Sequence, residues 1–411
     1  MSKVKVGEIT DSCLGKMLDA AKNKGEYAPY LANANVRWGT FDLSDLPQMR
    51  FESHEQERYG LQYGDLVMCE GGEPVRCAIW RDQIPGMKIQ KALHRIRVHD
   101  GVDVNWLYYW FLACGQRHLL DRFFIETTIK HLPGDRLKEI ELELPSSEEQ
   151  KGIGEVLSTL DAKIDLNTRL CAELESMART LYDYWFVQFD FPDEHGKPYR
   201  TNGGEMVWCA ELGRKVPKDW KVGTLSDLVS IQKEGFDPTA YGNETVEHYS
   251  IPAFDEGRYP SFETADTILS GKYTVPLGSI LFSKLNPQFK RIWDPPCLSN
   301  VRACSTEFMV YTPIEEALRP FVYATLNSDA YYRFTVQIAS SSTGSRKRLD
   351  PDATMRYTVI MPETHVCQQF CDQVKPILEQ AKKLQIENHE LTQLRDWLLP
   401  MLMNGQARVE G

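Results

Sequence analysis

A short loop that follows an apolar stretch concentrates side chains that can read a DNA base pair. It contains Lys284, Asn286, Gln288, Lys290 and Arg291. Asparagine and glutamine pair with adenine through two hydrogen bonds, arginine and lysine pair with guanine, and all four side chains also bind phosphate. The alternative is a solvated loop without a ligand. The residue types at this spacing favour contact with nucleic acid.

A second tract, SSSTGSRKR at 340–348, gathers hydroxyl groups and cations suited to a DNA backbone. A similar polar and basic tract occupies the matching position in the first half of the chain, which favours a binding role over a solvated loop. The candidates in the second half are Ser341, Thr343, Arg346, Lys347 and Arg348. The candidates in the first half are Thr127, Thr128, Lys130 and His131, with Lys22, Lys24, Arg76 and Arg81 as further basic residues.

Motifs for catalysis are missing from the sequence. No GxGxxG, GxxxxGK[ST], GxSxG or HExxH occurs. The tetrad DPPC at 294–297 is similar to the Asp/Asn-Pro-Pro-aromatic motif of amino-methyltransferases, but it lacks the aromatic residue and no glycine-rich AdoMet loop accompanies it. Ten cysteines are scattered without a CxxC pair, which is typical of reduced thiols rather than a zinc site. We expect no enzyme activity, no metal and no cofactor.

Two long helical patterns must position the candidate loops. From 145 to 186, apolar residues return at alternating steps of four and three, and adding 217 to each number gives a second such seam. A 3.5-residue period over four heptads indicates a coiled coil; the alternative is two ordinary amphipathic helices in separate domains. The first seam is Ile153, Leu157, Leu160, Ile164, Asn167, Cys171, Leu174, Ala178, Leu181 and Trp185. The second is Phe370, Val374, Ile377, Ala381, Leu384, Asn388, Leu391, Arg395, Leu398 and Leu402.

Each seam carries one asparagine, and the two differ in position. Asn167 is fifth of ten in the first seam, whereas Asn388 is sixth of ten in the second. Antiparallel pairing places the fifth position opposite the sixth, so that the two amides can hydrogen-bond each other and fix the register. The sequence therefore predicts one antiparallel pair within the chain.

The segments that precede the two helices repeat the same order of elements. At 411 residues the chain is long enough for two or three domains. We predict an α+β fold in which two pseudo-symmetric α/β domains are separated by two long helices that form an antiparallel coiled coil. The predicted boundaries are 1–144 for the first domain, 145–190 for the central helix, 191–212 for a connector, 213–361 for the second domain and 362–411 for the C-terminal helix.

The net charge of −11 argues against nucleic acid until its distribution is considered. Residues 139–194 carry 14 acidic and 4 basic side chains, whereas residues 277–349 carry 9 basic and 5 acidic ones. Local basic surfaces can bind phosphate while the whole chain stays acidic. No run of about 18 apolar residues occurs, and the N-terminus lacks an apolar signal core. We therefore expect a cytoplasmic protein that is neither secreted nor inserted into a membrane.

The chain resembles the specificity subunit of type I restriction–modification systems. The resemblance covers nearly the whole chain and is most specific in LPSSEEQKGIGEVLSTLDAKIDLNTRL running to LYDYWF, with RWGTFDLSDL, YGDLVMCEGGEPVRCAIW, GSILFSKLNP and LRDWLLPMLMNG in addition. In that family two target recognition domains alternate with two long helices. The resemblance implies that each domain reads one half of a bipartite asymmetric DNA target, and that the helices dock methyltransferase subunits while catalysis belongs to other subunits.

The expected partners are double-stranded DNA, methyltransferase subunits and restriction or translocase subunits. Aromatic residues crowded at the helix ends are the candidates for contact with protein partners: Tyr182, Trp185, Phe186 and Trp397. The second helix begins PETHVCQQF where the first begins PSSEEQKGI, so it lacks the Glu-Gln pair of the family. Two alternatives remain, a stand-alone DNA adenine methyltransferase and a coiled-coil scaffold without a DNA role.

Overall fold

The computed structural model describes residues 2–19, 21, 23–126, 129–341 and 347–409, and it divides into two compact units. The first unit is Met1–Lys163 together with Leu391–Gly411, and the second is Ile164–Glu390. Each unit combines strands and short helices with part of the two long helices α5 (Ser147–Tyr182) and α10 (Thr364–Met403). Among the described residues, no helix has the length and apolar character that crossing a membrane requires.

The first unit is built on a four-stranded sheet of order β2-β8-β5-β6. Helix α3 (Val104–Gln116) packs on this sheet through a fully apolar core that includes Trp106 and Phe111. A second sheet has the order β4-β3-β7, and β1 pairs with β11. The strands are β1 (Ser2–Lys5), β2 (Thr10–Leu14), β3 (Glu26–Leu31), β4 (Gln48–Phe51), β5 (Leu66–Cys69), β6 (Cys77–Ile79), β7 (Lys88–Ile89), β8 (Leu93–Val98) and β11 (Glu141–Leu144). The short helices are α1 (Val6–Ile9), α2 (Gln56–Tyr59) and α4 (Gly134–Lys138).

The second unit repeats this plan with a four-stranded sheet of order β15-β23-β20-β21 and a pair β14-β26. It adds a five-stranded sheet of order β16-β19-β22-β17-β18 and a hairpin of β12 and β13. The strands are β12 (Met206–Cys209), β13 (Arg214–Pro217), β14 (Lys221–Thr224), β15 (Val229–Gln232), β16 (Gly235–Phe236), β17 (Thr245–Tyr249), β18 (Ser261–Thr264), β19 (Lys272–Thr274), β20 (Ile280–Ser283), β21 (Ile292–Trp293), β22 (Arg302–Ser305), β23 (Phe308–Pro313) and β26 (Thr358–Met361). The helices are α6 (Ile251–Asp255), α7 (Arg319–Leu326), α8 (Asp329–Ile338) and α9 (Pro351–Thr354).

The predicted internal duplication is therefore confirmed strand by strand. Strands β2, β8, β5 and β6 occupy the same order as β15, β23, β20 and β21, and an α-helical segment follows the last of these strands along the chain in both units. The second unit interrupts that segment between α7 and α8, because Ser328 caps the new helix: its Oγ accepts a hydrogen bond from the backbone N–H of Tyr331 at 3.1 Å.

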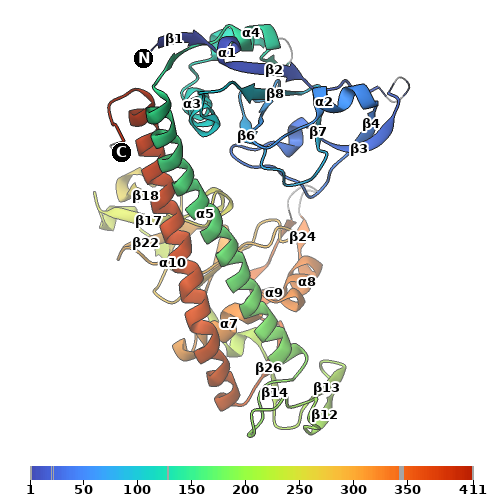
Figure 1. Ribbon diagram of the computed structural model, residues 1–411. Coiled ribbons are helices and arrows are strands. Elements are labelled where there is room, and N and C mark those ends of the chain that lie inside the picture. The colour runs from blue at the N-terminus through green and yellow to red at the C-terminus, as the bar shows by residue number, and fades with distance from the viewer. Residues whose placement is uncertain (1, 20, 22, 127–128, 342–346, 410–411) are drawn as a thin grey trace. The chain divides into compact units, whose positions relative to one another are not determined.

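The predicted antiparallel pairing of the long helices is also confirmed. In each unit α5 and α10 lie side by side and run in opposite directions (Figure 1). In the first unit Ile153 and Leu157, near the start of α5, share a core with Leu402, near the end of α10. In the second unit the ring centres of Tyr182 and Phe370 lie 6.2 Å apart, which joins the end of α5 to the start of α10.

The predicted hydrogen bond between the two seam asparagines is wrong. The amide of Asn167 donates to Oε2 of Glu387 at 2.8 Å, and the amide of Asn388 donates to the carbonyl of Ile164 at 3.2 Å and to Oγ1 of Thr168 at 3.1 Å. The physical reason is that a side chain in such a seam enters the space between residues of the facing helix rather than meeting one opposite residue. Both amides still bond across the seam, so they still specify its register.

Arg395 occupies a seam position that is apolar in a simple coiled coil. Its guanidinium donates to Oδ1 of Asp161 on α5 at 2.8 Å, and the hydroxyl of Tyr109 on α3 donates to Oδ2 of the same carboxylate at 2.7 Å. Burial lowers the pKa of Arg395, but the hydrogen bond and charge of Asp161 outweigh burial and raise it above its usual value. This three-residue network joins both long helices to α3 within the first unit.

Replacing Asp161 with alanine should destabilise the first unit. The variant leaves the half-buried guanidinium of Arg395 and the buried hydroxyl of Tyr109 without this acceptor, which costs about 1–3 kcal/mol of unfolding free energy. Urea unfolding followed by circular dichroism measures the change. The control is Asp165→Ala, because the Asp165–Arg169 pair is two-thirds exposed and should contribute little. Equal losses in both variants would contradict a structural role for the network.

Candidate nucleic-acid interface

In the first unit, a β-hairpin lies against the loop that follows the buried strand β5. The hairpin pairs β9 (Ile125–Glu126) with β10 (Lys130–His131). The backbone N–H of Gly72 donates to the carbonyl of Lys130 at 3.1 Å, and that of Leu132 donates to the carbonyl of Glu70 at 2.7 Å. The loop and the hairpin are therefore held together by main-chain hydrogen bonds rather than by side-chain contacts alone.

The second unit repeats this arrangement at the end of β20. Its hairpin pairs β24 (Ser340–Ser341) with β25 (Lys347–Arg348). The backbone N–H of Asn286 donates to the carbonyl of Lys347 at 2.8 Å, and that of Leu349 donates to the carbonyl of Lys284 at 3.0 Å. The two tracts predicted separately from the sequence therefore form one surface. We call the loop–hairpin pair of each unit its reading surface, defined as 70–76 with 125–126 and 129–132, and as 284–291 with 340–341 and 347–349.

Some predicted site residues lie outside the described residues, namely Lys22, Thr127, Thr128, Thr343 and Arg346. The backbone of Ser341 pairs with Lys347 in the hairpin. Lys24 is exposed, and Arg81 donates to the hydroxyl of Tyr63 and to Oδ1 of Asn105, so neither is hydrogen-bonded to the described part of the hairpin. Lys130 is exposed and His131 is half-buried on the hairpin itself.

Asn286 shapes its loop instead of presenting its amide to solvent. Its backbone has a φ of 49°, a left-handed conformation that asparagine tolerates better than most residues. Its Oδ1 accepts a hydrogen bond from the backbone N–H of Lys347 at 3.2 Å. Gln288, two residues later, is exposed, so it is the amide of this loop whose side chain faces solvent.

Several of the predicted cations are neutralised within the chain. Arg291 forms two hydrogen bonds to the carboxylate of Asp255 at 2.7 and 2.8 Å, and Arg348 pairs with Glu307 at 2.6 Å. Arg76 pairs with Glu73 at 2.7 Å and also donates to Oδ1 of Asn33.

Burial lowers the pKa of the two lysines in the loop after β20. The Nζ of Lys290 donates to the carbonyl of Asn327, and burial, together with the nearby charge of Arg179, lowers its pKa to about 8. Burial also lowers the pKa of Lys284, whose Nζ lies 5.4 Å from the centre of the Tyr273 ring. Lys347 is exposed and is the better placed lysine for a phosphate.

The sequence analysis missed Phe289, which lies between Gln288 and Lys290. Its side chain is 58% exposed, and the guanidinium of Arg291 lies 5.4 Å from its ring centre. Single exposed apolar side chains are common on protein surfaces, so Phe289 is a candidate because it lies on the hydrogen-bonded loop of the reading surface. A signal was present in the sequence, because the phenylalanine stands within a run of polar and basic residues.

The aromatic residues proposed for partner contact fall into two groups. Trp185 and Phe186 are buried at 3% exposure, and they pack with Tyr182 against Phe370. These three residues therefore have a packing role in the core of the second unit. Trp397 on α10 differs because it is 60% exposed.

Asp294, the first residue of the DPPC tetrad, has a structural role. The carboxylate of Asp294 accepts from the guanidinium of Arg319 and from Nζ of Lys382 at 2.7 Å. Burial raises the pKa of Asp294, but the two cations outweigh it and hold the pKa below its usual value. The group anchors the turn to α7 and α10, and an occupied carboxylate is not free to bind an amine.

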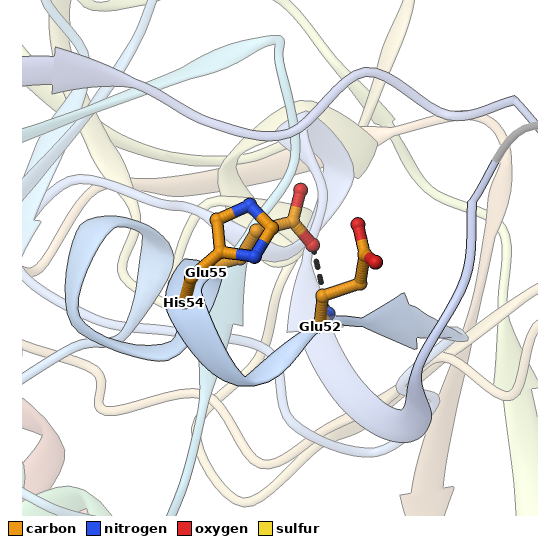
Figure 2. Close-up of side chains that lie close together, drawn as sticks. All are labelled: Glu52, His54 and Glu55. Atoms are coloured by element: carbon orange, nitrogen blue, oxygen red, sulfur yellow. Dashed lines mark hydrogen bonds between the residues drawn. The ribbon is translucent and has the colours of Figure 1, made fainter.

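One group of possible metal ligands, Glu52, His54 and Glu55, lies on the first unit, and Figure 2 shows the three side chains close together. Glu55 accepts from Nζ of buried Lys16 and from the backbone N–H of Glu52 at 2.9 Å. Burial opposes ionisation of Glu55, yet these hydrogen bonds hold its pKa below its usual value. A local turn and one ion pair account for the proximity of these side chains.

Comparisons with known proteins confirm the family resemblance. Residues 1–176 match the family described as the type I restriction modification DNA specificity domain. The MjaIX specificity subunit of Methanocaldococcus jannaschii is 26% identical over 332 residues, covering 76% of this chain and 71% of that protein. The HindI specificity subunit of Haemophilus influenzae is 24% identical over 335 residues, covering 68% and 72%. The crystal structure of a type I S subunit from M. genitalium has a TM-score of 0.61 at 15% identity, covering 98% of this chain and 96% of that one, so it shares the fold.

Replacing Asp294 with asparagine should destabilise the second unit by about 3 kcal/mol, because two half-buried cations, Arg319 and Lys382, lose their counter-ion. The folded pKa of Asp294 is depressed, so its contribution is present above its unfolded pKa and is lost as pH falls through the folded one. Urea unfolding at neutral and acidic pH should show a wild-type advantage that shrinks in acid. Exposed Asp266→Asn is the control. An unchanged stability would return this carboxylate to the list of candidate reactive groups.

Proposed function

We infer that this chain is a specificity subunit of a type I restriction–modification system. Its sequence relatives carry that name and its fold is that of an S subunit. We propose that each α/β domain, with boundaries at 1–144 and 213–361, reads one half of a bipartite asymmetric DNA target. The observation that supports this proposal is the reading surface, which occurs once in each unit at the end of the equivalent strand.

The residues of the second reading surface divide by role in this proposal. Lys347, exposed on the hairpin, grips a phosphate and gives affinity without sequence preference. Gln288, exposed on the loop, is suited to two hydrogen bonds with an adenine in the major groove. Phe289 supplies an apolar contact, such as one with a thymine methyl group. Asn286 and Arg291 hold the loop in shape through Lys347 and Asp255.

We propose that the chain itself performs no catalysis and acts in the cytoplasm with methyltransferase subunits and with restriction or translocase subunits. The names of the relatives, the missing catalytic motifs and the occupied carboxylate of Asp294 support this view. The exposed ring of Trp397 is the better candidate for contact with a protein partner among the four aromatic residues predicted for that role. No specific observation favours the stand-alone methyltransferase or the scaffold without DNA.

Two variants of the second reading surface should distinguish contacts with the DNA phosphates from contacts with the bases. In complexes with methyltransferase subunits, Lys347→Gln should weaken binding to all DNA sequences alike and reduce the slope of log affinity against log salt by about one. Gln288→Ala should instead cost about 1–3 kcal/mol at one base pair and relax specificity there. Titrations of labelled duplexes at several salt concentrations measure both effects.

The matched control is Arg333→Gln, because Arg333 is exposed on α8, outside the reading surface. It should leave the sequence preference unchanged. A uniform loss of affinity in both Lys347→Gln and Gln288→Ala would show that the loop does not read bases. Normal binding in every variant would remove the reading surface from the proposal.

Exchange of residues 213–361 with the matching segment of a relative should change one half of the methylated target. The other half and the number of unspecified base pairs between the halves should stay constant, because neither the first domain nor the helices change. Methylation-sensitive sequencing of DNA from cells that carry the hybrid and its partner subunits measures the outcome. Changes in both halves would mean that the two domains read DNA jointly.

A further inference from the structure

A pocket of about 380 Å³ opens in the second unit where the chain leaves α5. Its apolar lining includes Val187, Phe189 and Trp208, and its charged lining consists of Arg200, Arg214 and Lys215. The hairpin of β12 and β13 contributes Trp208 and Lys215, which face each other in the strand register. The pocket combines aromatic surface with three cations, and the DNA proposal uses none of these residues.

The geometry of the pocket is fixed by its own contacts. The guanidinium of Arg214 donates to the carbonyl of Val187 at 3.3 Å and lies 4.7 Å from the ring centre of Phe189. The guanidinium of Arg200 donates to the carbonyl of Gln188 at 3.5 Å. Phe189 itself has a φ of 65°, so its backbone is held in a conformation that bulky residues rarely adopt. These contacts preform the cationic wall without neutralising it.

The three cations of this pocket are not paired with carboxylates of the described residues. Within the described part of the chain, no carboxylate lies within ion-pair distance of Arg200, Arg214 or Lys215, although the whole chain has a net charge of −11. The ring of Trp208 is 67% exposed at the rim. Tryptophan and arginine are the residues most enriched among those that dominate protein–protein binding energy.

We propose that this pocket binds a segment of a partner polypeptide that carries carboxylates beside an aromatic or large aliphatic side chain. The cations select the carboxylates, and Val187 and Trp208, which are 41% and 67% exposed, cover the apolar group. Strands β12 and β13 pair with each other in a sheet of two, so their outer edges can add an extended segment through main-chain hydrogen bonds. Within the second unit, β12 and β13 lie at the end of α5 away from β24 (Figure 1), which favours a protein over the DNA of the reading surface.

The test uses the full chain and a fluorescein-labelled ten-residue peptide in which Asp and Glu alternate with Phe and Leu. Fluorescence anisotropy should show that it binds more tightly than the same peptide with Asn and Gln in place of the acids. Trp208→Ala and Lys215→Gln should each weaken binding by about 5–10-fold. Both side chains are exposed, so folding should be unaffected, and circular dichroism checks this. Matched controls are Phe262→Ala and Arg333→Gln, which remove an exposed aromatic ring and an exposed cation elsewhere in the second unit.

Equal binding of the acidic and amide peptides by the wild type, or no binding of either, would overturn the proposal. So would undiminished binding by Trp208→Ala and Lys215→Gln. A labelled oligothymidylate serves as competitor and as second probe. If it bound more tightly than the peptide and lost affinity in the same two variants, the pocket would belong to nucleic acid instead. The result is independent of the reading surface, because Lys347 and Gln288 stay intact throughout.

Discussion

The antiparallel seam of α5 and α10 is the constraint on which the rest of the structure depends. An all-apolar seam buries surface in several registers with similar energy, whereas a polar side chain must find a partner or lose about 1–3 kcal/mol. Asn167, Asn388 and Arg395 each find a partner on the other helix in the observed register. Polar contacts of this kind can fix the direction and register of a helix pair, and here they act beside the apolar packing of the seam.

The two units share a plan but differ in how the helix begins. At the start of α5, Ser146 and Glu149 form a capping box, with hydrogen bonds of 3.1 and 3.3 Å between side chain and backbone. Gln150 then accepts from the backbone N–H of Asp103 at 2.9 Å, which ties α5 to the start of α3. The start of α10 has no Glu-Gln pair. It packs instead through Phe370 into the hydrophobic core of the second unit. Duplicated folds can thus reach the same junction through polar or through apolar contacts.

The sequence predicted the duplication, the long helices and their direction, because those depend on periodicity and on the offset of two asparagines. The sequence did not predict the hydrogen-bond partners of the two asparagines, because those depend on the small axial offset between the two helices. It also placed Trp185 and Phe186 at a partner surface when they lie in a core, since an aromatic cluster at a helix end has the same pattern in both cases. Within the second reading surface, the loop and the hairpin are far apart in sequence: Asn286 and Lys347 are separated by 61 residues. Their contact could therefore be seen only in the folded structure.

The ion pairs of the reading surface bear on specificity. A surface of unpaired arginines would bind any DNA through counterion release, and that binding carries no sequence information. Asp255 and Glu307 form ion pairs with Arg291 and Arg348, and burial lowers the pKa of Lys290 to about 8. These contacts reduce the non-specific attraction and fix the side chains at the same time. In the proposed role, Gln288 and Phe289 are exposed on a preorganised loop, so that recognition of a base pair would cost less conformational entropy. In the proposed role, a surface whose arginines are paired with carboxylates suits a reader that relies on base contacts for selection.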